Sequence, residues 1–195
     1  LTADVDVEGP AAGTAFERFT RDGPLALLPL PGPTSGAVRT MSLVWCMPSA
    51  RADRREHLAD GDLLAELQAE LGERNGRVRA IRARGRYPLV EQARDDVREH
   101  RVVHIGNAAQ TLHPVAGQGF NLALRDVAML AELLAEGGDP GAPELLARYA
   151  EWRAPDRAAV VRFTDSLVRG FGLPLGPLGR VRGQGLVLFD LLRPV

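Results

Sequence analysis

The sequence predicts an α+β fold in which a run of strands is followed by a run of helices. Short apolar or alternating segments, separated by proline and glycine, fill the first ninety residues. Apolar residues recur at helical spacing in the second half, after a glycine pair at Gly117 and Gly119. The 195 residues are 45% hydrophobic and 25% charged, as in globular proteins. They suffice for one core, or for one and a half domains.

The first half of the chain favours strands, because its apolar segments are short and end at proline or glycine. The predicted strands are the segment that begins at Leu1 and residues 14–20, 25–30, 38–47 and 77–90. Residues 31–36 predict a hairpin-like turn between two of them. One helix interrupts the series. We expect Asp60 to cap it, a leucine stripe to begin at Leu63, and Gly72 to end it.

Longer helical patterns follow in the second half. Residues 119–136 predict a helix that stops at Gly137 and Gly138, and residues 143–169 predict another. Residues 178–192 are strongly apolar and predict a last helix. The strands and the long helices therefore occupy separate parts of the chain.

The most informative segment covers residues 102–126. Its apolar start, residues 102–105, predicts a short buried strand that ends at Gly106. A turn with glycines at 117 and 119 then leads into a helix, and such a turn presents free backbone N–H groups and the positive end of the helix dipole. It suits an electron-rich group such as a phosphate, a carboxylate or a reduced flavin. Taken alone, the two glycines also fit a packing turn, since a dinucleotide fingerprint would need a third glycine where Leu122 stands.

The whole segment resembles the second flavin-binding motif of the aromatic-hydroxylase class of FAD monooxygenases, G-D-A-A-H-x-x-x-P-x-x-G-Q-G-x-N-x-x-x-x-D. The matching residues are Gly106, Ala108, Ala109, Pro114, Gly117, Gln118, Gly119, Asn121 and Asp126. Asn107 stands where the motif has Asp, and Gln110 where it has His. The form of residues 107–114 is similar to that of the ubiquinone-biosynthesis branch. Segments 15–20, 23–30, 42–46, 87–89 and 164–168 also resemble that branch, so the resemblance spans nearly the whole chain.

The resemblance implies the C-terminal part of a two-domain FAD-dependent hydroxylase. The chain carries no G-x-G-x-x-G, so we expect the N-terminal Rossmann unit to be absent from it. Residues 1–95 would form part of the substrate-domain sheet. Residues 96–137 would hold the second flavin motif and a helix of the FAD domain, and residues 138–195 the C-terminal helices.

The implied activity is hydroxylation of the ring of 2-polyprenyl-6-methoxyphenol in ubiquinone biosynthesis, through a flavin C4a-hydroperoxide. FAD would be the cofactor, and NAD(P)H and O2 the co-substrates. Two alternatives stay open. The chain could belong to another ring hydroxylase of the same pathway, or the isolated 195 residues could be a non-catalytic module that binds a lipid or a partner. We expect the isolated residues to be inactive.

The resemblance assigns a set of cofactor-binding residues. They are Gly106, Asn107, Pro114, Gly117, Gln118, Gly119, Phe120 and Asn121. Asn107 would bond the ribityl chain, more weakly than an Asp because it carries no charge. The glycines would let the backbone approach the isoalloxazine. The cofactor performs the difficult step, so no catalytic side chain is assigned. Two roles stay open for Asp126. It could contact the flavin, or it could form a structural pair with Arg125 that anchors the helix.

Other candidate residues carry weaker signals. The four histidines have no metal-ligand spacing. Among them, we expect His113 to form hydrogen bonds within the loop; the alternative is that it acts as a catalytic base. Residues 51–57 predict a solvated loop or helix face. Five residues on two predicted strands are expected in the core, or alternatively in the lining of a cavity. They are Trp45, Cys46, Met47, Tyr87 and Leu89.

Composition limits the classes of partner. A net charge of −1 gives no electrostatic case for nucleic acid. The single Cys46 excludes an internal disulfide and fits a reducing cytoplasm. Apolar residues 178–192, flanked by arginines, suit either packing or peripheral contact with the inner membrane. A ubiquinone-biosynthesis protein complex is a further partner that stays open.

Overall fold

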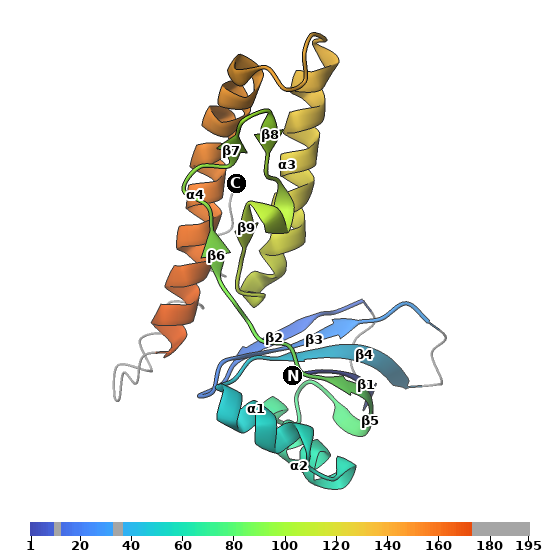
Figure 1. The fold of residues 1–195 in the computed structure, drawn as a ribbon. Coiled ribbons are helices and arrows are strands. Elements are labelled where there is room, and N and C mark those ends of the chain that lie inside the picture. Colours follow the sequence, from blue (N-terminus) through green and yellow to red (C-terminus); the bar gives the residue numbers. More distant parts are fainter. Residues whose placement is uncertain (10–12, 33–36, 173–195) are drawn as a thin grey trace, which may run out of the picture.

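The computed structural model describes residues 1–9, 13–32 and 37–172, which form an antiparallel sheet and, above it, a long helix pair (Figure 1). The sheet has the strand order β2-β3-β4-β1-β5. Its strands are β1 (Thr2–Glu8), β2 (Phe16–Phe19), β3 (Pro24–Pro29), β4 (Val38–Trp45) and β5 (Arg77–Gly85). Neighbouring strands pair antiparallel throughout.

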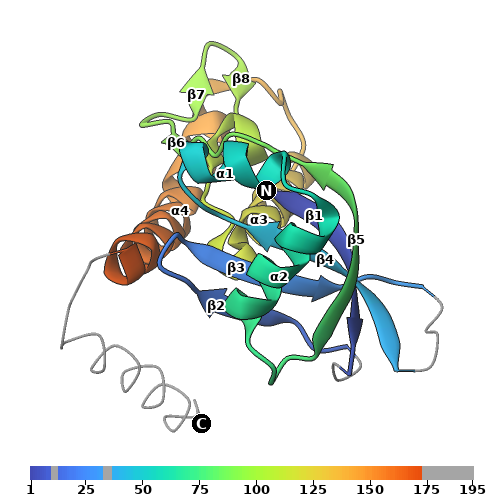
Figure 2. The same ribbon diagram turned by 90° about the horizontal axis from the view of Figure 1, so that it is seen from below.

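One face of the sheet forms the first core, because every second residue of its strands is apolar. Val5 lies opposite Met41, and Leu27 lies opposite Leu43, so that their side chains share this face. Helices α1 (Ser49–Glu56) and α2 (Asp60–Leu71) lie across it, as Figure 2 shows. Leu63 is completely buried against the strands. The helices therefore cover this face of the sheet and leave the opposite face open.

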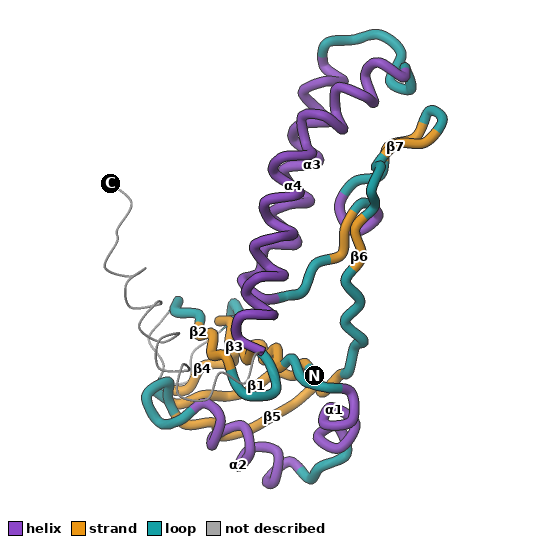
Figure 3. The backbone as a smooth tube through the Cα atoms, turned by 90° about the vertical axis from the view of Figure 1, so that its left-hand side faces the viewer, coloured by secondary structure: helices purple, strands orange, loops and turns teal. Residues whose placement is uncertain are grey.

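The helix pair consists of α3 (Gln118–Ala135) and α4 (Pro143–Gly172), which lie side by side (Figure 3). Short elements run along it. They are β6 (Gln92–Ala93) paired with β9 (Gln110–Thr111), β7 (Arg98–Glu99) paired with β8 (Val102–Val103), and the 3-10 turns η1 (Gly106–Ala108) and η2 (Val115–Gly117). A second core joins Val97, Ala109, Leu133 and Tyr149. No helix within the described ranges is both long enough and apolar enough to cross a membrane.

The predicted α+β class is confirmed, and so are the expected helices that correspond to α2, α3 and α4. The helix α1 and the short pairs β6–β9 and β7–β8 were not predicted as such, and two local expectations about Asp60 and residues 102–105 are wrong. Asp60 does not cap α2; Ala59 precedes the helix without a side-chain cap, and the Asp60 carboxylate pairs with Arg84 instead. Residues 102–105 do not form a buried strand. β8 has only two residues, and Val102 is 45% exposed in a small hairpin with β7. The helix expected over residues 178–192 lies outside the described residues.

The charged run at residues 51–57 is a helix face, but it is not solvated throughout. Arg55 is buried, with its guanidinium 4.0 Å from the centre of the Trp45 ring. It also forms salt bridges with Asp22 (3.0 Å) and Glu66 (2.9 Å). A guanidinium can be buried in this way because its charge is paired and its flat face stacks on an aromatic ring.

Candidate functional site

The face of the sheet opposite α1 and α2 is divided into an apolar half and a charged half. The strand register places Ala26 opposite Val44, and next to them Leu28 lies opposite Ser42, so the surface of β3 and the end of β4 is mostly apolar and uncharged. On the β1–β5 side of the same face, Asp6 bonds both Arg82 and Thr40. The apolar half is therefore the part that can receive an uncharged ring.

A loop before α3 lies over the apolar half and forms one wall of an open cavity of about 650 Å3. From the sheet side the lining is Ala15, Phe16, Glu17, Pro24, Ala26, Leu28, Val44 and Cys46. From the loop side it is Leu112, His113, Pro114, Gly117, Gly119 and Phe120. Phe120 is 72% exposed, although it is among the largest apolar side chains of the chain. A cavity of this size with few polar groups is typical of small-molecule sites.

The start of α3 presents an accessible backbone to this cavity. Gly117 precedes the helix in a left-handed conformation (φ 60°), and no side chain caps the helix. A Cβ added at Gly117 or Gly119 would meet nothing within 4 Å. Gly119 itself has an ordinary helical backbone, so the requirement for positive φ falls on Gly117 and not on Gly119. The start of α3 thus presents the positive end of the helix dipole to the cavity, which suits an electron-rich ring.

Asp126 anchors this loop from inside. Its side chain is completely buried, and Oδ1 accepts a hydrogen bond from Nε of Arg153 on α4 (2.7 Å). Oδ2 accepts one from the backbone N–H of Gly106 and one from Gln110 Nε2, each at 2.9 Å. Gly106 has φ 55°, a conformation that favours glycine. The carboxylate therefore holds the start of the loop to both long helices.

The same network explains one departure from the family motif. Gln110 is buried, donates to Asp126, and accepts from Arg157 Nε through Oε1 (2.7 Å). It joins the loop to α4 and lies away from the cavity lining. Arg125 does not pair with Asp126; it pairs with Asp156 (2.5 Å). Of the alternatives for Asp126, the geometry favours the helix anchor, with Arg153 as the partner.

The predicted site residues are only partly brought together. Pro114, Gly117, Gly119 and Phe120 line the cavity. Asn107 lies outside it on η1, with an exposed side chain that makes no hydrogen bond to the described residues. The remaining predicted residues also lie outside the lining: Gly106, Gln118 and Asn121. An extended ligand would have to reach from the cavity to η1 to contact all of them.

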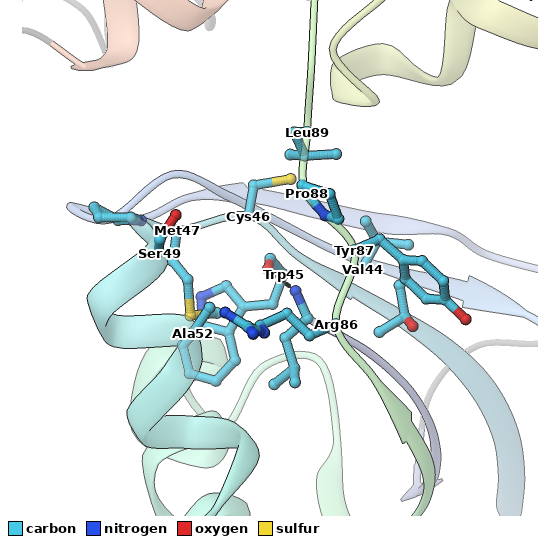
Figure 4. A pocket seen from close by; sticks show the side chains of 13 residues that line it. Val44, Trp45, Cys46, Met47, Ser49, Ala52, Arg86, Tyr87, Pro88 and Leu89 are labelled. Atoms are coloured by element: carbon cyan, nitrogen blue, oxygen red, sulfur yellow. Dashed lines mark hydrogen bonds between the residues drawn. The ribbon is translucent and has the colours of Figure 1, made fainter.

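Two smaller cavities adjoin the first at Cys46, with volumes of about 270 and 380 Å3. Figure 4 shows the second of these, with Cys46 and Trp45 pointing to opposite sides of the strand end. Burial raises the pKa of the Cys46 thiol to about 11, so it stays protonated. Tyr87 and Leu89 are 67% and 51% exposed and line this cavity.

The core expectation is therefore wrong for Tyr87 and Leu89, which follow the end of β5. It is right for Trp45, which is completely buried. Cys46 is buried and lines all three cavities, so the expected core position and the alternative of cavity lining both hold for it. Ala26 and Val44, which form the floor of the largest of these cavities on the sheet, were not predicted as site residues. Their alternation with buried leucines and Trp45 along the strands was a usable signal.

His113 is a hydrogen-bonding residue of the loop, as expected. Its Nδ1 accepts a hydrogen bond from the backbone N–H of Val115 (3.2 Å). Burial lowers the pKa of the imidazole below its usual value of 6.5, against the opposing effect of Glu91 and Glu17. His104 instead pairs with Glu99, outside the cavities. Over the described ranges no three side chains of His, Cys, Asp or Glu gather to hold a metal ion.

Comparisons with known proteins show which proteins this chain resembles. Residues 3–164 match the family model described as FAD binding domain. Ubiquinone hydroxylase UbiL of Rhodospirillum rubrum is 40% identical over 204 residues, which is 100% of this chain and 45% of UbiL. The 3-demethoxyubiquinol 3-hydroxylase of Escherichia coli is 32% identical over 191 residues, or 96% of this chain and 47% of that protein. The chain spans about half the length of the curated relatives that it matches.

Solved structures share the fold. PqsL from Pseudomonas aeruginosa aligns with a TM-score of 0.56 at 20% identity, over 88% of this chain and 49% of PqsL. The anhydrotetracycline hydroxylase OxyS from Streptomyces rimosus aligns with a TM-score of 0.52 at 24% identity, over 98% of this chain and 36% of OxyS. At these identities the likeness concerns the fold alone.

Proposed function

Since the chain belongs to the FAD binding domain family and FAD is therefore its cofactor, we propose that it is part of a monooxygenase that hydroxylates a prenylated phenol. The predicted resemblance to ubiquinone-biosynthesis hydroxylases is confirmed by the named relatives. The substrate that we propose is 2-polyprenyl-6-methoxyphenol, with NAD(P)H and O2 as co-substrates. The observation that carries the proposal is the apolar cavity between the uncapped start of α3 and the sheet.

The residues of the loop fit a flavin ring at this place. The bound FAD would supply electron transfer from NAD(P)H and the activation of O2. The N–H groups at the start of α3 would stabilise the negative charge that a reduced ring carries, because the positive end of the helix dipole lies there. Gly119 leaves the space that a flat ring needs. The apolar floor at Ala26 and Val44 would keep water away from the reacting atoms.

The two smaller cavities give room for a prenyl tail. They meet the cavity of about 650 Å3 at Cys46 and are lined largely by apolar side chains, among them Met47 and Leu89. A ring held over Val44 could therefore extend its tail past Cys46 toward Met47 and Leu89. Burying each methylene of such a tail is worth about 0.8 kcal/mol.

We keep the proposed division of the chain into residues 1–95, 96–137 and 138–195. The sheet core lies in the first of these, and the second core draws Leu133 from the second range and Tyr149 from the third. Contact with the inner membrane, a cytoplasmic location and a ubiquinone-biosynthesis protein complex remain proposals. The segment that motivated membrane contact, residues 178–195, lies outside the described residues.

Asn107 is proposed to bond the ribityl chain of FAD through one neutral hydrogen bond. Its exposed amide makes no hydrogen bond to the described residues and is free to bind a ligand. We expect Asn107→Ala to weaken FAD binding by about 0.5–1.5 kcal/mol, the net value of such a bond. Titration of the apoprotein with FAD, followed by flavin fluorescence, measures the change. Asn75→Ala, in the turn between α2 and β5, is the matched control, and equal FAD affinity of the two variants would refute the assignment.

The function itself is tested with the protein expressed from its complete coding sequence. After desalting, visible absorbance shows whether FAD stays bound. The protein is then given NADH or NADPH, air and either 2-polyprenyl-6-methoxyphenol or the intermediates of the neighbouring hydroxylation steps. Hydroxylation of the first compound supports the proposal. Hydroxylation of another intermediate only would identify a sister ring hydroxylase, and absence of bound flavin in the complete protein would overturn the proposal. The alternative of a non-catalytic module concerns the isolated 195 residues, and it is tested by adding FAD to them and recording visible absorbance after desalting.

A further inference from the structure

We propose that His113 binds the substrate: its Nε2–H donates a hydrogen bond to the hydroxyl oxygen of the aromatic ring. This inference rests on the proposed function, because it assigns a contact within the same cavity. His113 lines both the cavity of about 650 Å3 and the adjoining one of about 270 Å3. A ring placed between the start of α3 and the sheet would therefore lie beside the imidazole.

The loop fixes which nitrogen of His113 is free. Nδ1 accepts the backbone N–H of Val115, a residue that is only 1% exposed. A neutral imidazole has one acceptor and one donor nitrogen, so Nε2 carries the proton. Burial holds the pKa of His113 below 6.5, and the ring is neutral at pH 7. The side chain therefore offers a single N–H donor.

The cavity offers few other partners for a phenolic oxygen. Among its lining residues, only Glu17, Cys46 and His113 have side chains that form hydrogen bonds. The Glu17 carboxylate could accept the O–H of a phenol, but it cannot donate a hydrogen bond to the ring oxygen, and it would repel a phenolate. The Cys46 thiol, held in its protonated form, is a weak donor. A hydroxyl oxygen whose lone pairs are buried without a donor costs free energy, so these lone pairs are expected to turn toward the Nε2–H of His113.

Two substitutions separate this contact from the role of His113 in the loop. In His113→Asn, the side-chain oxygen can still accept the Val115 N–H, but no group remains at the place of Nε2. In His113→Gln, the amide nitrogen reaches the place of Nε2, but no acceptor remains for Val115. His100→Gln is the control, because His100 lies in the turn between β7 and β8, away from the cavities.

The experiment measures binding to the complete FAD-loaded protein by perturbation of the flavin spectrum. The probes are 2-methoxy-6-prenylphenol and the analogue that lacks the hydroxyl group, and the readout is the ratio of their dissociation constants. We expect the wild type to prefer the phenol roughly tenfold. His113→Asn should lose this preference and keep its affinity for FAD. His113→Gln should keep most of the preference, and His100→Gln should behave like the wild type.

The proposal is overturned if the wild type binds both compounds equally, whether or not it hydroxylates the phenol. It is also overturned if His113→Asn keeps the preference, or if His113→Gln loses as much of it as His113→Asn does. The proposed function can fail separately. In that case no hydroxylated product forms, while the pattern of dissociation constants among the variants still supports the contact.

Discussion

Arg153→Met is expected to destabilise the helix pair by about 3–5 kcal/mol, because it removes one partner of a buried ion pair. The side chains of Arg153 and Asp126 are 1% and 0% exposed, and their salt bridge measures 2.7 Å. Methionine fills much of the same volume but leaves the Asp126 carboxylate buried without its cation. Urea unfolding of the complete protein, followed by circular dichroism, measures the loss. Because Asp126 also holds Gly106, FAD affinity should fall as well.

The matched control is Arg148→Met on the same helix. The Arg148 salt bridge to Glu136 is exposed on both sides, and an exposed pair is expected to contribute little. Its unfolding midpoint should stay close to that of the wild type. If Arg153→Met unfolds at the same urea concentration as Arg148→Met, the buried pair does not anchor the loop and the account of Asp126 is wrong.

Gly119→Val is expected to remove FAD while leaving the fold intact. A Cβ at Gly119 meets no atom of the chain within 4 Å, and the backbone there has ordinary helical φ. The side chain would therefore occupy only the space assigned to the isoalloxazine. Overpacking of this kind costs about 1–3 kcal/mol, which corresponds to a roughly 5- to 150-fold weaker affinity for FAD.

Gly61→Val provides a control of the same geometry. Gly61 is the second residue of α2, as Gly119 is of α3, and a Cβ there also meets nothing within 4 Å. Flavin absorbance after desalting, with the thermal midpoint as a check of folding, compares the two variants. Gly61→Val should retain FAD. Full flavin content in Gly119→Val would mean that the glycine turn serves packing alone.

The order of strands and helices could be predicted because their patterns are local. Alternation in β1 and the glycines at 72 and 137 need no knowledge of distant residues, and both glycines do adopt positive φ. Apolar content alone misled at residues 102–105, since a two-residue hairpin strand buries little. Asp60 was mistaken for a cap because its competing partner, Arg84, comes from another element.

The candidate site was predicted on its loop side only. The motif carries the loop, whereas the floor depends on the register that sets Ala26 opposite Val44, and no local pattern fixes a register. The anchor of Asp126 was equally hidden, since Arg153 follows 27 residues later. A usable signal was the cluster of Arg153, Asp156 and Arg157 at helical spacing on α4, which places three charges on one side of the helix.

We propose that this chain helps to hold FAD over an apolar cavity where a phenol ring is hydroxylated with oxygen from O2. The most direct test supplies the complete protein with FAD, reduced nicotinamide cofactor and 2-polyprenyl-6-methoxyphenol under an atmosphere of 18O2, and determines the mass of the product. We expect a ring-hydroxylated product that carries one heavy oxygen atom, with the second oxygen atom of O2 released as water. A hydroxylated product whose new oxygen comes from solvent water, or a bound FAD that is reduced and reoxidised without any hydroxylated product, would contradict it.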